Sequence, residues 1–108
     1  MQNSNLIIAD SSELIVKGLR SILEPFVKNE ILFAVNFIEL KEIIKNLKNV
    51  FLVIDYTSQG FSLEELVELK NIYPKTLMMA VTPYTNAQTI VQAIRAGIES
   101  HIKKECSV

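Results

Sequence analysis

Short apolar runs alternate with segments of helical periodicity along the whole chain. The runs contain mostly bulky or β-branched side chains and span residues 6–9, 31–35, 50–54, 76–81 and 98–103. The last run is the weakest, because Glu99, Ser100 and His101 interrupt it. Continuous apolar runs of this length predict strands that are buried on both faces, as in a parallel sheet with helices on either side.

Four segments between the runs carry apolar residues at the spacing of one helical face. They cover residues 14–23, 40–47, 63–73 and 87–94. Ser62 and Glu65 have the spacing of a capping box, which predicts that the third helix begins directly after Ser62. Gly97 follows the fourth helix at a position where a left-handed residue commonly ends one. Strand and helix therefore alternate strictly, which predicts a doubly wound α/β domain.

The end of the chain is short for this architecture. A doubly wound sheet normally covers its last strand with a further helix, but the chain stops four residues after Lys104. Either that final helix is absent or truncated, or the chain is a fragment of something longer. An apolar flank left uncovered on the fifth strand favours self-association, so we expect a homodimer.

The composition is that of one compact domain without nucleic-acid affinity of its own. The 108 residues are 49% hydrophobic and include only three Gly and three Pro, which leaves ample apolar material for a core. Eleven basic and twelve acidic residues give a net charge of -1, without the positive charge on which nucleic-acid binding depends. Cys106 and His101 are the single residues of their kinds, so neither a disulfide nor a structural zinc site is expected.

The N-terminal segment lacks the features of a targeting sequence. It has no basic region, and its apolar run stops after four residues, so a signal peptide is not expected. No stretch approaches the roughly 18 apolar residues of a membrane span. We therefore expect a cytoplasmic protein that does not bind membranes.

Polar side chains follow four of the five predicted strands at the point where each strand ends. They are Asp10 and Ser11, Asp55, Thr82, and the pair Lys103 and Lys104. The carboxyl ends of parallel strands meet at one edge of a sheet, where α/β proteins bind their ligands. Carboxylates bind Mg²⁺, one of them can attack a phosphoryl group, and Lys and Thr can stabilise its oxygens. The pattern therefore indicates phosphoryl-transfer chemistry at this edge.

Four motifs in this order resemble the receiver domain of two-component response regulators. They are IIADS at 7–11 with LRSIL at 19–23, VID at 53–55, AVT at 80–82, and AGIESHIKK at 96–104. The resemblance implies a flavodoxin-like (CheY-like) fold, a doubly wound parallel sheet of five strands in the order 2-1-3-4-5. It also implies that residues 1–108 are one receiver domain, the N-terminal part of a longer regulator. The tail KECSV at 104–108 is similar to the subfamily whose output is a LuxR/NarL-type helix-turn-helix.

The resemblance implies a function in phosphorelay signalling. A sensor histidine kinase or phosphotransfer protein would transfer a phosphoryl group to Asp55 and so switch an output, such as a DNA-binding transcription domain outside this segment. Asp10, Asp55 and the backbone carbonyl of Thr57 match the positions that bind Mg²⁺ in the family. Thr82 and Lys104 match the residues that contact the phosphoryl group. The chain would not be an enzyme beyond its own phosphoryl transfer and autodephosphorylation.

Three features depart from the family pattern. Ser11 stands where the second acidic Mg²⁺ ligand is expected, Pro83 has no N–H to donate to a phosphoryl oxygen, and the loop at 56–61 lacks the usual Met-Pro. We therefore expect a weak Mg²⁺ site and weak phosphorylation. The alternative is a degenerate receiver that acts as a protein-interaction module without phosphorylation. A flavodoxin-like cofactor binder is disfavoured, because no glycine-rich phosphate loop follows any strand.

Several of these residues also have plain structural interpretations, which the sequence leaves open. Asp10 and Ser11 are also suited to begin the following helix, and Asp55 to cap the loop after its strand. His101 lies where the family tends to carry a switch aromatic residue, but an ordinary surface histidine fits as well. The other aromatic and methionine residues are interpreted as core; they are Phe26, Phe33, Phe51, Met78 and Met79.

Overall fold

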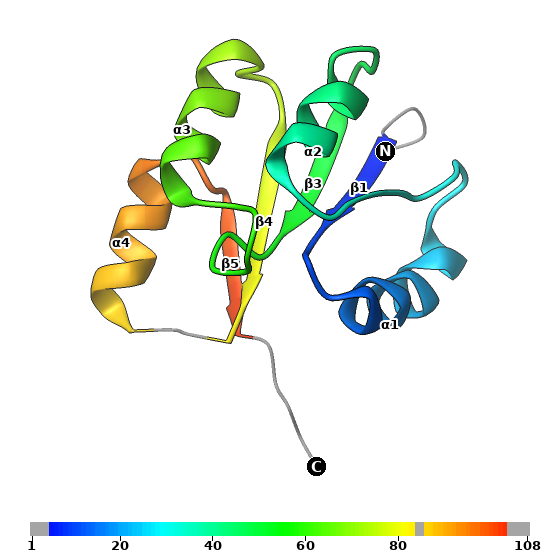
Figure 1. The fold of residues 1–108 in the computed structure, drawn as a ribbon, viewed down its shortest axis with the longest axis horizontal. Coiled ribbons are helices and arrows are strands. Elements are labelled where there is room, and N and C mark those ends of the chain that lie inside the picture. The colour runs from blue at the N-terminus through cyan, green and yellow to red at the C-terminus, as the bar shows by residue number, and fades with distance from the viewer. Residues whose placement is uncertain (1–4, 84–85, 104–108) are drawn as a thin grey trace.

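Strands and helices alternate through the described part of the chain, as the apolar pattern predicts (Figure 1). The structure is a computed structural model that describes residues 5–83 and 86–103. The elements are β1 (Asn5–Ala9), α1 (Glu13–Leu23), the 3₁₀ turn η1 (Glu24–Phe26), β2 (Leu32–Ala34), α2 (Phe37–Ile44), β3 (Val50–Ile54), α3 (Leu63–Ile72), β4 (Leu77–Thr82), α4 (Ala87–Arg95) and β5 (Ser100–Lys103). Each predicted strand and helix is present, with ends that differ from the pattern by a few residues.

The strands form one parallel five-stranded sheet in the order β2-β1-β3-β4-β5. This order confirms the predicted doubly wound, flavodoxin-like architecture. The chain first moves from β1 to the edge strand β2 and then crosses back to β3. The direction of winding therefore reverses between β1 and β3, and doubly wound sheets bind their ligands at this switch point.

Each described α-helix begins with a polar side chain that accepts a backbone N–H from the first turn. The caps are Ser12, Asn36, Ser62 and Asn86, at donor–acceptor distances of 2.8–3.3 Å. Ser62 accepts the N–H of Glu65 at 3.2 Å, which confirms the predicted start of α3. Gly97 follows α4 with a φ of 106°, so the predicted left-handed residue is also confirmed. No helix in residues 5–83 and 86–103 is both long and apolar enough to cross a membrane.

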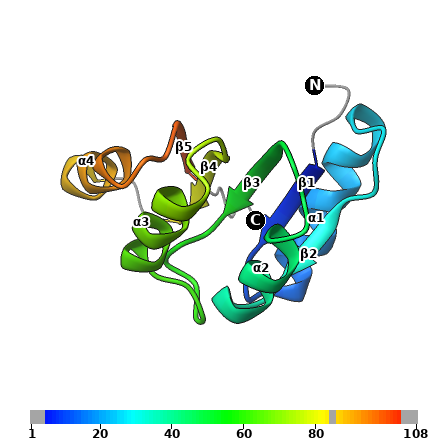
Figure 2. The same cartoon turned by 90° about the horizontal axis from the view of Figure 1, so that it is seen from above.

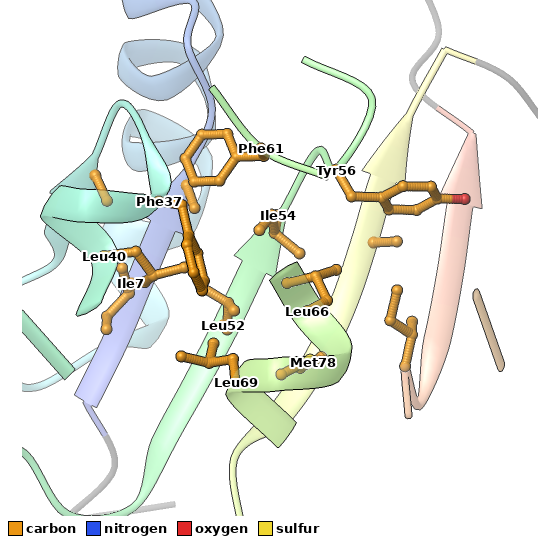
Figure 3. Close-up of a cluster of buried hydrophobic side chains, with 14 of the residues drawn as sticks. Ile7, Phe37, Leu40, Leu52, Ile54, Tyr56, Phe61, Leu66, Leu69 and Met78 are labelled. Atoms are coloured by element: carbon orange, nitrogen blue, oxygen red, sulfur yellow. The ribbon is translucent and has the colours of Figure 1, made fainter. Parts of the chain in front are cut away.

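Helices cover both faces of the sheet (Figure 2), and a layer of clustered apolar side chains lies on each face. α2, α3 and α4 pack on one face, and α1 packs on the other. Ile7 and Ile54 belong to the first layer, whereas Ile8 and Val53 belong to the second, because successive strand residues point to opposite faces. All four are almost fully buried, which explains why the strands are continuous apolar runs. Figure 3 shows the larger layer, under α2 and α3.

The layer on the α1 side leaves apolar residues exposed within the described residues. Leu77 of β4 and Ile102 of β5 are 44% and 48% exposed.

Phe26 is predicted to lie in the core, but its side chain is 82% exposed, so that prediction is wrong. Phe26 lies in η1, beyond the end of α1. An apolar side chain in a turn can point to either side, and its apolar character alone does not show which. The prediction about a final helix concerns residues beyond Lys103, which lie outside the described residues.

Candidate functional site

Asp10 and Asp55 leave adjacent strands at the same level of the sheet. Ala9 is the register partner of Ile54, and the N–H of Asp55 donates to the carbonyl of Ala9 at 3.0 Å. Adjacent strands lie about 4.8 Å apart, so the residues that follow them are neighbours. Asp10 and Asp55 are buried, with 3% and 4% of their surface exposed. The structure therefore brings the two candidate carboxylates together at the switch point.

The carboxylate of Asp55 organises the loop that follows β3. Its Oδ1 atom accepts hydrogen bonds from the backbone N–H of Thr57 at 2.9 Å and from the Thr57 hydroxyl at 2.5 Å. The hydroxyl of Ser58 donates to the Asp55 carbonyl at 2.8 Å. The interpretation that Asp55 caps this loop is therefore confirmed. It is compatible with a chemical role, because these bonds give the carboxylate a defined orientation at the edge of the sheet.

Ser12 is the residue that caps α1. Its hydroxyl accepts the N–H of Ile15 at 3.3 Å, while Oδ1 of Asp10 accepts the N–H of Ser12 at 2.9 Å. The interpretations of Asp10 and Ser11 as helix caps are therefore wrong, because Asp10 completes the turn between β1 and α1 and the helix begins after Ser12. Ser11 is exposed, and its N–H donates to the hydroxyl of Ser58 at 3.4 Å. This bond joins the turn after β1 to the loop after β3.

Thr82 and Lys103 lie at the same edge of the sheet, at the ends of β4 and β5. Thr82 is fully buried and is the register partner of Lys103, which is exposed. Pro83 follows Thr82 and is exposed, and as a proline it has no N–H to donate toward the site. Lys104, the candidate for contact with the phosphoryl group, lies outside the described residues.

Tyr56 and His101 form a contact that the sequence pattern does not reveal. The Tyr56 hydroxyl lies 2.9 Å from Nε2 of His101, and the rings meet edge-on with their centroids 5.8 Å apart. Figure 3 shows the Tyr56 ring extending from the end of β3 across β4 toward β5. Tyr56 is buried and His101 is half-buried. The interpretation of His101 as an ordinary surface histidine is therefore wrong, because its ring packs inward against Tyr56.

Burial and the charge of Asp55 both shift the pKa values of Tyr56 and His101. Burial lowers the pKa of His101 below the ordinary imidazole value, and the negative charge of Asp55 offsets part of that effect. Burial also raises the pKa of the Tyr56 phenol, and Asp55 adds to that shift. Tyr56 and His101 are therefore both neutral near pH 7.

The oxygen atoms at this edge form a donor set of low charge. Asp10 and Asp55 supply two buried carboxylates, and the residue that follows Asp10 is the neutral, exposed Ser11. The described residues contain no group of three or more His, Cys, Asp or Glu side chains that could hold a metal ion. Mg²⁺ commonly binds one or two carboxylates and keeps several waters. The two carboxylates therefore fit a hard divalent cation whose coordination shell is completed by water.

Comparisons with known proteins bear on this architecture. No protein-family model matches the sequence, and a comparison with curated protein sequences gives no match either. Solved structures match over nearly the whole chain. The signal receiver domain of an HD domain-containing protein from Pseudomonas fluorescens Pf-5 is similar with a TM-score of 0.82 and 18% identity, over 95% of this chain and 76% of that chain.

Two longer proteins are similar to the same extent. A response regulator from Burkholderia pseudomallei, solved with a phosphorylated aspartic acid, a calcium ion and citrate, has a TM-score of 0.83 and 24% identity, over 97% of this chain and 62% of its own. The RcsB response regulator from Salmonella typhimurium has a TM-score of 0.84 and 22% identity, over 99% and 54%. The chain thus spans less than two thirds of the length of these two proteins. It has the CheY-like fold of response regulator receiver domains.

Proposed function

We propose that this chain is a receiver domain that accepts a phosphoryl group on Asp55 and transmits the change to an output. The observation that carries the proposal is the buried pair of Asp10 and Asp55 at the switch point of a CheY-like sheet. Two buried carboxylates repel each other unless a cation or hydrogen bonds compensate their charge. This arrangement supports a site for a cation beside a nucleophilic carboxylate.

In the proposed reaction a carboxylate oxygen of Asp55 attacks the phosphorus atom of a phosphorylated histidine or of a small phosphoryl donor. A bond from that oxygen to phosphorus forms while the bond from phosphorus to the donor breaks, and the donor keeps the electron pair. Thr57 orients the carboxylate through its two hydrogen bonds to Oδ1. The hydroxyl of Thr82 and the ammonium group of Lys104 would contact the phosphoryl oxygens.

Asp10, Asp55 and the backbone carbonyl of Thr57 would hold Mg²⁺. The bound ion would neutralise the negative charge that accumulates when the phosphoryl group arrives. Ser11 is neutral and exposed, so water would replace the second acidic ligand and the site would be weak. The calcium ion in the Burkholderia pseudomallei response regulator supports a divalent cation site in this fold.

The partners follow from the same proposal. A sensor histidine kinase or phosphotransfer protein would supply the phosphoryl group in the cytoplasm, and an output DNA-binding domain outside residues 1–108 would respond. The match to RcsB over 54% of that protein supports a receiver that is one part of a longer regulator. The net charge of -1 argues against nucleic-acid binding by this segment. The exposed side chains of Leu77 and Ile102 support a homodimer.

A degenerate receiver, which binds a partner without phosphorylation, is the second candidate. Two observations favour it: Ser11 supplies no negative charge, and Pro83 supplies no N–H beside Thr82. A hydrogen bond to a charged group contributes about 1.5–3 kcal/mol. Its loss would therefore weaken retention of a phosphoryl group by roughly ten- to a hundredfold.

Intact mass spectrometry after incubation with acetyl phosphate and Mg²⁺ separates the two candidates. We expect slow, partial addition of one phosphoryl group, which Asp55→Asn abolishes and EDTA suppresses. The variant Ser11→Asp with Pro83→Ala should increase the labelled fraction. If neither the wild type nor this variant is labelled, the degenerate receiver is supported. Labelling that persists in Asp55→Asn would show that another residue is the acceptor.

A further inference from the structure

The two nitrogen atoms of His101 have different surroundings. Nε2 lies 2.9 Å from the Tyr56 hydroxyl, whereas Nδ1 is buried and has no hydrogen-bond partner among residues 5–83 and 86–103. His101 is the single histidine of the chain. Within the described part of the chain, its ring therefore combines one hydrogen-bonded nitrogen with one that is shielded from water and has neither a donor nor an acceptor.

The unsatisfied nitrogen determines which neutral form of the ring is favoured. A neutral imidazole carries one N–H and one bare nitrogen. With the proton on Nε2, the ring donates to the Tyr56 hydroxyl and leaves only a lone pair at Nδ1. With the proton on Nδ1, an N–H would be buried without an acceptor, which costs free energy. The neutral ring therefore carries its proton on Nε2, and a second proton must go to Nδ1.

We propose that His101 is a pH-sensitive switch: the neutral ring stays packed against Tyr56, and protonation at Nδ1 moves the ring to solvent and releases Tyr56. A protonated Nδ1 has no acceptor in its buried position, so the cation is stable only where water reaches it. Tyr56 directly follows Asp55, so its release changes the start of the loop that Asp55 and Thr57 organise. The link from this switch to signalling rests on the function proposed for Asp55.

Few charged groups face the ring from the described residues around it. β4 carries no titratable side chain, and α4 carries only Arg95, which is exposed at its last residue. On β5 itself, Lys103 is exposed. Among the described residues, the carboxylate of Asp55 is the charge that acts on the ring, and it favours the cation. Removing that negative charge should therefore lower the pKa of His101 further.

Nitrogen-detected or long-range ¹H–¹⁵N NMR of the imidazole tests the switch on the 108-residue chain. The titration is done in EDTA and without a phosphoryl donor. We expect the Nε2–H form at neutral pH and a pKa below the ordinary imidazole value of 6.5. The ring signals of Tyr56 should shift with the same midpoint, whereas those of Tyr73 should not. In Asp55→Asn the midpoint should move to lower pH.

The variant His101→Phe is the matched control, because it keeps an aromatic ring at the position and removes the titration. The pH-dependent shift of the Tyr56 signals should be lost in it. An Nδ1–H form, a midpoint at or above 6.5, or a Tyr56 shift that persists in His101→Phe would overturn the proposal. If His101→Phe does not fold, the proposal is tested by two observations on the wild type: which nitrogen of the neutral His101 ring carries the proton, and the pH midpoint of its titration. Failure of acetyl phosphate labelling would instead reject phosphoryl acceptance and leave the switch in place.

Discussion

Lys70 of α3 forms an ion pair of 2.7 Å with Glu99, at the turn that leads into β5. Lys70 also donates to the carbonyl of Thr76, and Oε1 of Glu99 accepts the N–H of Met78 at 2.8 Å. One ion pair thus joins α3, the start of β4 and the start of β5. This cluster lies at the amino-terminal ends of the strands, opposite the candidate site. There it fixes the position of β5, the outermost strand on that side of the sheet.

We predict that Glu99→Ala lowers the free energy of unfolding by about 1–2 kcal/mol, because it removes an ion pair and a hydrogen bond that are partly shielded from water. The side chain of Lys70 is only 20% exposed. Glu24→Ala is the matched control, since the pair of Glu24 with Arg20 is exposed on both sides and should contribute less than about 0.5 kcal/mol. Urea denaturation measures both. Equal losses in the two variants would contradict the role given to Glu99.

The contribution of Glu99 should depend on pH. Burial alone would raise the pKa of Glu99, but the hydrogen bonds from Lys70 and Met78 outweigh it, so the pKa lies below the ordinary value of 4.5. A carboxylate whose pKa is lowered by folding stabilises the protein above the ordinary pKa. That stabilisation is lost as the pH falls through the folded-state value. The difference in unfolding free energy between the wild type and Glu99→Ala should therefore narrow below pH 4.5, and a widening would contradict this account.

Replacing glycine with alanine should have opposite effects on stability at positions 97 and 18. Gly97 has a φ of 106°, and an added Cβ would lie 2.8 Å from Cγ of Lys70. Gly97→Ala should lower the free energy of unfolding by about 1–2 kcal/mol through backbone strain alone. Gly18 lies inside α1 with nothing within 4 Å of an added Cβ, so Gly18→Ala should stabilise by about 0.5–1 kcal/mol. Thermal denaturation of the two variants and the wild type measures both changes. A Gly97→Ala variant as stable as the wild type would contradict the predicted strain.

The hydroxyl of Thr57 should stabilise the loop after β3. Thr57→Val keeps the shape of the side chain but removes its hydrogen bond to Asp55, and should lower the free energy of unfolding by about 0.5–1.5 kcal/mol. Thr57→Ser retains the hydroxyl, so its free energy of unfolding should fall clearly less than that of Thr57→Val. Urea denaturation compares the two variants. If they lose equal stability, the effect comes from packing of the methyl group instead.

Mg²⁺ affinity should increase when Ser11 is replaced by an acidic residue. Ser11 is exposed next to the buried carboxylate of Asp10, so Ser11→Asp adds a negative ligand without disturbing the core. We expect binding at least about tenfold tighter, which corresponds to about 1.4 kcal/mol. Ser11→Asn is the neutral control and should bind like the wild type. Isothermal titration calorimetry measures the Mg²⁺ affinity of the wild type and of both variants. Equal affinities in all three would argue against a cation site at this edge.

The sequence by itself determines the elements and the composition of the candidate site. Strands buried on both faces are continuous apolar runs, whereas helices repeat apolar residues every three or four positions, so the apolar pattern shows where each element lies. Ser62 begins α3 because its side chain binds the backbone three residues later, which is a local interaction. Asp10 and Asp55 meet because parallel strands end at one edge. These features follow from neighbours along the chain and from the direction of the strands.

Only the tertiary structure decided those long-range contacts that the shared direction of the strands does not imply. The contact between Tyr56 and His101 joins residues 45 positions apart, and it depends on the register that sets His101 opposite Ala80. The exposure of Phe26 depends in the same way on where α1 ends relative to the sheet. Periodicity specifies the face of an element on which a residue lies, but register and packing against other elements decide what that face touches.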